Sequence, residues 1–154
     1  MAVNIENRNK SVLEILNGVL TAIKTVVPLD YGLGKPCLLE HSLQMQFGVL
    51  IGFTGDIKGK LVLSGDASLF SLIGERMYGM ALEGEMLSSF SGELGNMIAG
   101  GMATNLAEDG VRTDITSPTV MQGDTTLSGF KKAIEVTISY VELGDMDIYL
   151  MLDN

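Results

Sequence analysis

Three polar residues, Ser89, Glu93 and Asn96, stand four and three positions apart within an apolar stretch of the chain. On an α-helix this spacing places their side chains in one stripe, because successive turns bring residues three and four apart onto the same face. At about 100° per residue, apolar residues such as Phe90 and Leu94 centre on the opposite side. The sequence therefore predicts a helix that buries its apolar face and presents a carboxylate beside a carboxamide to solvent.

The same residues carry a resemblance to a known family. Pro118 follows Asn96 by twenty-two positions. The whole pattern, a Ser or Asp, a Glu four later, an Asn three later and a downstream Pro, resembles the signature of the CheC/CheX phosphatases of bacterial chemotaxis. Partial copies at Glu6–Asn9 and Glu14–Asn17 lack both the preceding Ser or Asp and the downstream Pro. The CheC branch typically carries two full motifs, so the one full motif points to the CheX branch.

This resemblance implies a single CheX-like domain over residues 1–154 that hydrolyses the aspartyl phosphate of a CheY-like response regulator. It implies that Glu93 pairs with the active-site lysine of the regulator and that Asn96 positions the attacking water. An uncharged carboxamide suits this role, because it accepts a hydrogen bond from water without repelling the phosphoryl group. The regulator carries its own Mg²⁺, so no cofactor or metal ion of the enzyme is expected. Ser89 and Pro118 are expected to be structural.

Glycines interrupt the predicted motif helix, where each costs up to about 1 kcal/mol relative to alanine. Gly101 falls on the apolar side and is predicted to let the helix pack closely on a sheet. Gly100 falls on the stripe of Glu93 and Asn96, where two interpretations stay open. It either serves close packing as well, or leaves bare backbone that another protein can approach.

The periodicity of the remaining sequence predicts the elements that position this helix. Apolar residues at helical spacing predict a first helix over 6–27, and Asp66 is a plausible N-cap for a second helix ending at Met80. Because hairpins rather than crossover helices connect the strands, we predict an α+β fold, a largely antiparallel β-sheet with long amphipathic helices packed on one face, as in CheC-like proteins. The motif helix is expected over 85–108, a turn at 55–59, and strands at 35–40, 44–54, 60–64, 111–116, 120–122, 132–142 and 147–152.

Composition limits the kinds of partner and compartment. A net charge of −9 and a pI near 4.4 argue against nucleic acid and anionic membranes as partners. No apolar run has the length of a membrane span and no export signal is evident, so we expect a cytoplasmic protein. Cys37, the single cysteine, is predicted to be a small buried apolar residue, and the only histidine, His41, has no evident nucleophile partner.

The chain is also expected to form a homodimer. The resemblance implies it, since CheX-like proteins pair through their sheets. The strands at 132–142 and 147–152 offer a physical reason, because they are rich in β-branched and apolar residues. A single domain would leave at least one such edge unpaired, and an unpaired edge invites pairing with another chain.

Three hypotheses for the function stay open at this point. The first is a CheX-like phosphatase of a phosphorylated response regulator. The second is a non-catalytic CheC-like module that binds a response regulator or a motor-switch protein without hydrolysis. The third is an unrelated α+β domain that binds a small molecule. The sequence identifies neither the regulator nor the cellular process it controls.

Overall fold

A computed structural model describes residues 5–153, with side-chain surroundings for all of these except 5–11 and 131. Every strand pairing in this range is antiparallel, which confirms the predicted α+β class. No helix within the described range is both long and apolar enough to cross a membrane. The elements in chain order are α1 (Ile5–Val26), β1 (Tyr31–Leu33), β2 (Cys37–Gly55), β3 (Gly59–Gly65), α2 (Ala67–Tyr78), α3 (Gly84–Glu108), β4 (Thr113–Ile115), β5 (Thr119–Tyr140) and β6 (Gly144–Leu152).

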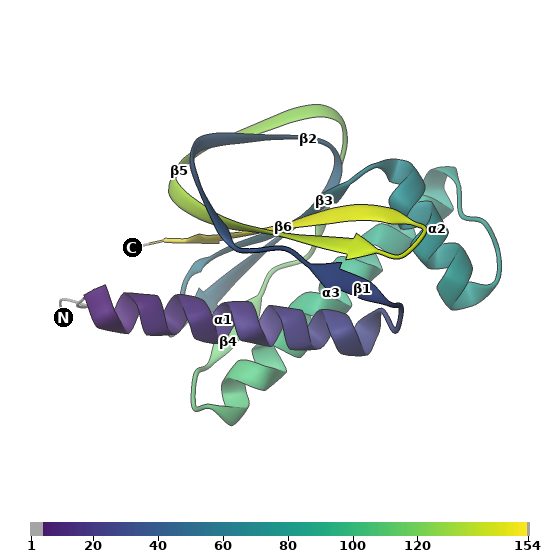
Figure 1. Cartoon of the computed structure of the whole chain (residues 1–154). Helices are drawn as coiled ribbons and strands as arrows, with labels where there is room; N and C mark the ends of the chain where they lie inside the picture. The colour runs from purple at the N-terminus through teal and green to yellow at the C-terminus, as the bar shows by residue number, and fades with distance from the viewer. Residues whose placement is uncertain (1–4, 154) are drawn as a thin grey trace.

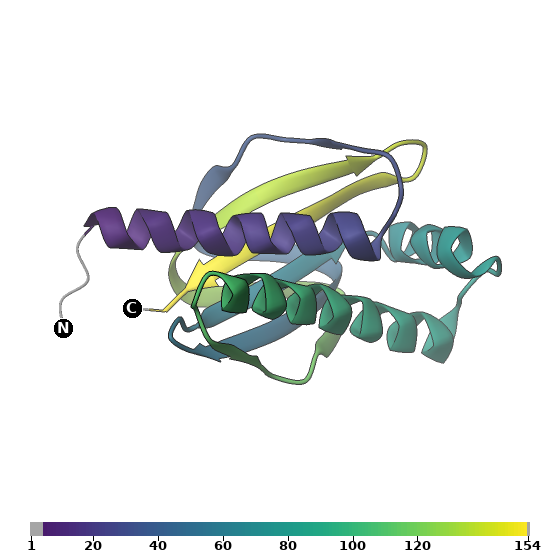
Figure 2. The ribbon, with the colours of Figure 1, turned by 90° about the horizontal axis from the view of Figure 1, so that it is seen from below.

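The two long helices, α1 and α3, lie side by side across one face of the sheet, and α2 lies at its end (Figure 2). Gly101 of α3 faces α1, because a Cβ built on it would lie 2.8 Å from the Cβ of Ala22. The prediction that Gly101 packs on the sheet is therefore wrong. Gly95 has that role, since a Cβ there would lie 2.7 Å from Val49 Cγ1 and 2.9 Å from Ile51 Cδ1 of β2.

Two strands are much longer than the sequence predicts. β2 joins the segments expected at 35–40 and 44–54, and β5 joins those expected at 120–122 and 132–142. The sheet order is β1-β5-β6-β3-β2-β4, and β5 also pairs with β2. The paired β2–β5 ribbon arches over the face opposite the helices (Figure 1). The ribbon covers a second apolar cluster whose buried members are Leu43, Met45, Val62, Ala133, Tyr149 and Met151.

The C-terminal strands do not supply the free edge on which the dimer argument rested. β6 pairs with β5 on one side and with β3 on the other, and β5 pairs with β1 and β2 on the side away from β6. That physical reason for a dimer is therefore wrong. Within the described residues, the part of β2 over 37–46 pairs with β5 alone, so its other side is a free edge. Cys37, at the start of this edge, is exposed rather than buried as predicted.

Candidate functional site

Helix α3 presents the predicted stripe to solvent. Ser89 and Glu93 are exposed and Asn96 is half-buried. On the opposite side of the helix, Leu94 and Ile98 are fully buried in the core between the helices and the sheet. This is the arrangement expected from the spacing, and it results from the large apolar area that only this orientation removes from water. The carboxylate and the carboxamide therefore share one open helical face.

Pro118 borders the Asn96 side of this face. A Cβ built on Gly92, one turn before Asn96, would lie 3.7 Å from Pro118 Cγ. The segment before Pro118 is fixed to β2, since the Gly52 N–H donates to Thr116 Oγ1 at 2.9 Å and the Thr116 N–H donates back to the Gly52 carbonyl at 2.8 Å. The proline thus stands at a defined place between this anchor and the first residue of β5.

The serines near the motif have different surroundings. The Ser91 hydroxyl is buried and donates to the Leu87 carbonyl at 2.7 Å, and the Ser88 hydroxyl accepts a hydrogen bond from Gln122 of β5. These two bonds hold the start of α3 and connect it to the sheet. Ser89 lies on the open side, where it is exposed. The sequence motif includes Ser89 but gives no sign of the Ser88–Gln122 bond, because only the fold brings β5 beside this turn.

Gly100 lies on the same open face, one turn after Asn96. A Cβ built on Gly100 would meet no heavy atom within 4 Å. Close packing within the protein therefore does not require a glycine here. Of the two interpretations left open by the sequence, an accessible backbone next to Glu93 and Asn96 fits the structure.

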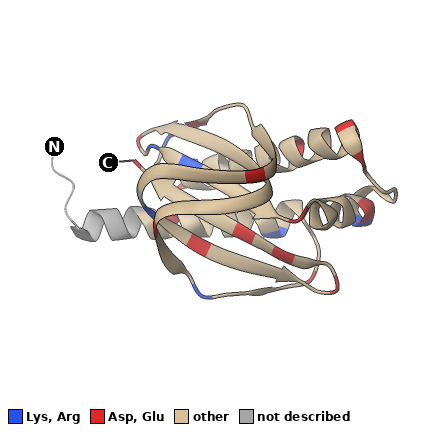
Figure 3. Ribbon diagram, turned by 90° about the horizontal axis from the view of Figure 1, so that it is seen from above, with Lys and Arg blue, Asp and Glu red and all other residues tan. Residues whose placement is uncertain are grey.

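The open face continues into a shallow groove of about 460 Å³ between the C-terminal half of α3 and β4. Small residues of α3, Ala103 and Ala107, form one wall, and Arg112 and Thr113 form part of the other. No group of three or more metal-ligating side chains occurs among the residues that the structure describes. On the face of the sheet opposite the helices, acidic residues are visible along the strands (Figure 3). The site on α3 therefore combines one carboxylate and one carboxamide with open backbone and small side chains.

This fold and this helical site define a class of protein, the CheC-like superfamily. The structure is similar to that of a CheC-like superfamily protein from Shewanella sp. PV-4, with a TM-score of 0.78 and 25% identity, covering 99% of this chain and 100% of that chain. It is also similar to CheX in a CheX–CheY–BeF3–Mg²⁺ complex from Borrelia burgdorferi, with a TM-score of 0.77 and 19% identity, covering 93% and 97% of the two chains. The latter likeness shows the shared fold.

Two sequence comparisons identify the family. The sequence model of the family described as "Chemotaxis phosphatase CheX" matches residues 47–139, which include the whole motif from Ser89 to Pro118. CheY-P phosphatase CheX from Thermotoga maritima is 32% identical over 141 residues, which is 88% of this chain and 91% of the relative. The chain belongs to the CheX family of chemotaxis phosphatases. The resemblance predicted from the motif is confirmed, and an unrelated small-molecule-binding domain is excluded.

Proposed function

We propose that this chain hydrolyses the aspartyl phosphate of a CheY-like response regulator, with Asn96 positioning the water and Glu93 holding the regulator. The observation that carries the proposal is that α3 presents Glu93 and Asn96 together on an open face with bare backbone at Gly100. The names of the T. maritima and B. burgdorferi relatives support the choice of partner. The cytoplasmic location and the absence of a metal ion of its own are part of the same proposal.

In the proposed reaction, no side chain of α3 forms a covalent bond to the phosphoryl group. The oxygen of a water forms a bond to phosphorus while the bond from phosphorus to the aspartyl oxygen breaks, so the products are inorganic phosphate and the free carboxylate. The water proton leaves with the phosphate or passes to solvent. Such a transfer depends on in-line positioning of the water and on neutralisation of the developing charge. The regulator's Mg²⁺ neutralises the charge. The Asn96 carbonyl positions the water by accepting a hydrogen bond from it.

Glu93 has a different role in this proposal. It is exposed on α3, so its carboxylate is free to pair with a cation of the partner. Pairing with the regulator's active-site lysine fixes the direction in which the helix approaches. A charge-assisted hydrogen bond of this kind is worth about 1.5–3 kcal/mol. The same contact keeps the Asn96 amide close to the phosphoryl group.

The decisive experiment compares Asn96→Ala with Asn17→Ala in a decay assay of the phosphorylated regulator. Asn17 is an exposed asparagine of α1 and belongs to the partial motif, which makes it a matched control. Loss of water positioning should reduce the acceleration by about 100-fold or more in Asn96→Ala, and Asn17→Ala should behave as the wild type. Equal acceleration by Asn96→Ala and the wild type would remove Asn96 from the catalytic role, and no acceleration by either would favour the non-catalytic, regulator-binding module instead.

The proposal also includes a homodimer. The supporting feature is the free edge of β2 over 37–46, where unpaired backbone groups run beside the exposed side chain of Leu38. An edge of this length in a soluble protein is normally covered or blocked. Pairing of two copies along it would cover the edge and leave α3, on the other face of the sheet, open to the regulator.

A further inference from the structure

We propose that Tyr78, Met80 and Met86 form an apolar docking surface, the α2–α3 patch, for an apolar part of the regulator beside its phosphorylation site. The inference rests on the proposed function, because it extends the area around Glu93 and Asn96 that the regulator covers. The patch selects among regulators and takes no part in the chemistry.

The three side chains of the patch are exposed although they are large and apolar. The exposed fractions are 58% for Tyr78, 54% for Met80 and 56% for Met86, and the three lie within nine residues of one another. The Tyr78 ring packs edge-to-face on the ring of Phe90 at a centroid distance of 5.8 Å. Met86 lies one helical turn before Phe90 on α3. Phe90 thus contacts Tyr78 and lies one turn from Met86, and exposed apolar residues gathered in this way commonly mark an interaction site.

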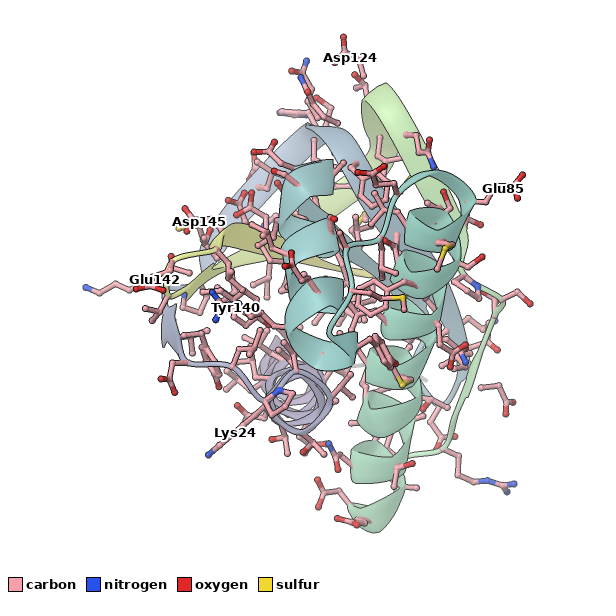
Figure 4. The ribbon with its side chains drawn as sticks, turned by 90° about the vertical axis from the view of Figure 1, so that its right-hand side faces the viewer. Lys24, Glu85, Asp124, Tyr140, Glu142 and Asp145 are labelled. Carbon is pink, nitrogen blue, oxygen red and sulfur yellow. The ribbon has the colours of Figure 1, made fainter. Side chains whose placement is uncertain are left out.

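The connection that carries the patch is held in place by the helices on either side. The Ser71 hydroxyl of α2 donates to the Leu82 carbonyl at 2.8 Å, and the Leu82 side chain is buried against Gly74. Gly79 ends α2 in the left-handed conformation, and its N–H donates to the Glu75 carbonyl at 2.7 Å. Figure 4 views the end of the molecule where α2 and α3 meet. Because the backbone beneath the patch is held by these contacts, a partner that binds there avoids the entropic cost of ordering that backbone.

The patch lies within reach of a partner seated on the motif. Met86 precedes Glu93 by seven residues, which is about two turns or 10 Å along the helix and nearly the same direction around it. An ordinary interface covers about 800 Å² on each partner, equivalent to a disc with a radius of about 16 Å. A regulator centred on Glu93 and Asn96 therefore covers Met86, and the Tyr78 ring is placed near this region by its packing on Phe90.

The chemistry of the motif explains why such a surface is needed. Glu93 and Asn96 would recognise a lysine and an acyl phosphate, which are groups that response regulators share. Discrimination between regulators must then come from contacts around the phosphorylation site. Tyrosine and methionine are suited to this, since aromatic residues often dominate interface energies and methionine adapts its shape to a partner.

The test uses the double variant M80Q/M86Q, with L13Q as the control. Glutamine keeps an unbranched side chain of good helix propensity but makes the surface polar. Leu13 is an equally exposed apolar residue, 59% exposed, and lies on α1. Binding is titrated against each CheY-like regulator of the same organism activated with BeF3⁻ and Mg²⁺, and kcat and KM are measured with the phosphorylated forms. For the preferred regulator, M80Q/M86Q should weaken binding and raise KM about 5- to 20-fold while kcat stays unchanged. The variant should therefore discriminate less than the wild type between this regulator and the others.

The outcomes separate this inference from the proposed function. An unchanged affinity in M80Q/M86Q, or an equal loss in L13Q, overturns the docking surface even when the wild type accelerates phosphate loss. Tight binding that depends on the patch, without any acceleration by the wild type, supports the surface and overturns the proposed hydrolysis. Absence of binding to every activated regulator overturns both.

Discussion

Glu93 and Asn96 lie three residues apart on α3, but they differ in their contact with water. Glu93 is exposed, and Asn96 is half-buried beside the segment that contains Pro118. An exposed carboxylate is well placed to meet a cation that approaches from outside. A half-buried residue has fewer side-chain directions available, which favours a defined position for a water molecule. The difference in surroundings therefore matches the two roles proposed for these residues.

Replacement of Glu93 by glutamine tests the first of these roles. Glu93→Gln keeps the size of the side chain but removes its charge, so regulator affinity should fall about 10-fold or more, the equivalent of about 1.5 kcal/mol. Stability should not change, because the side chain is exposed. Titration with the BeF3⁻-activated regulator measures the effect, and Glu108→Gln at the other end of α3 is the charge-matched control. Equal affinities for the two variants would remove Glu93 from the interface.

At the scale of the elements, the glycines of α3 fit two different surroundings. Gly95→Ala would place a methyl group 2.7 Å from Val49 Cγ1, so it should lower the free energy of unfolding by about 1–3 kcal/mol. Gly100→Ala meets no atom within 4 Å, so the better helix propensity of alanine should raise it by about 0.5–1 kcal/mol. Urea denaturation of both variants checks the pair. Destabilisation by Gly100→Ala would show that other atoms of the protein occupy the space beside Gly100.

The pairing of β5 with β6 predicts a dependence of stability on pH. Burial, and then the charge of Asp147, raise the pKa of Glu135, and burial and the two carboxylates raise the pKa of Tyr149 to about 12. Glu135 lies opposite Tyr149, and the Thr137 hydroxyl opposite Asp147 donates to its Oδ1 at 2.7 Å. Because the folded state holds the Glu135 proton more tightly than the unfolded state does, stability from this group is present at low pH and is lost as the pH rises through the raised value.

Glu135→Gln removes the carboxyl group whose ionisation causes this loss of stability. It should therefore stabilise the protein by a few tenths of a kcal/mol at pH 7, the size typical of screened surface charges, and by less at pH 4. Urea denaturation at the two pH values provides the measurement, with Glu142→Gln in the exposed β5–β6 turn as the control. A larger gain at pH 4 than at pH 7 would contradict the assigned direction of the shift.

At the scale of the whole molecule, the free edge of β2 makes the dimer testable. Leu38 is 66% exposed at this edge, so Leu38→Lys should introduce a charge into the interface without disturbing the core. Sedimentation equilibrium at micromolar concentration should show a dimer for the wild type and a shift toward monomer for Leu38→Lys. Leu13→Lys on α1 should remain dimeric. A monomeric wild type would contradict the dimer itself.

The sequence determined the features that depend on neighbours along the chain. The stripe of Ser89, Glu93 and Asn96 follows from helical periodicity alone, and the motif helix ends where it was predicted, at Glu108. The hairpin of β2 and β3 was likewise predictable, since its turn lies within a few residues of both strands. The family could be recognised because its motif lies on one helix and the loop that follows. Local spacing is enough for such features, because their geometry is fixed within one or two turns.

Only the tertiary structure decided which elements meet. β5 continues through Gly123 and Gly129, both in the left-handed conformation, because β2, some 80 residues earlier in the chain, supplies its partner. The same pairing places the C-terminal strands inside the sheet and leaves 37–46 as a free edge. Likewise, the contact between the rings of Tyr78 and Phe90 results from the way α2 docks on α3. Contacts between distant segments depend on which apolar surfaces cover one another in the folded chain, and periodicity along a single segment carries no record of that choice.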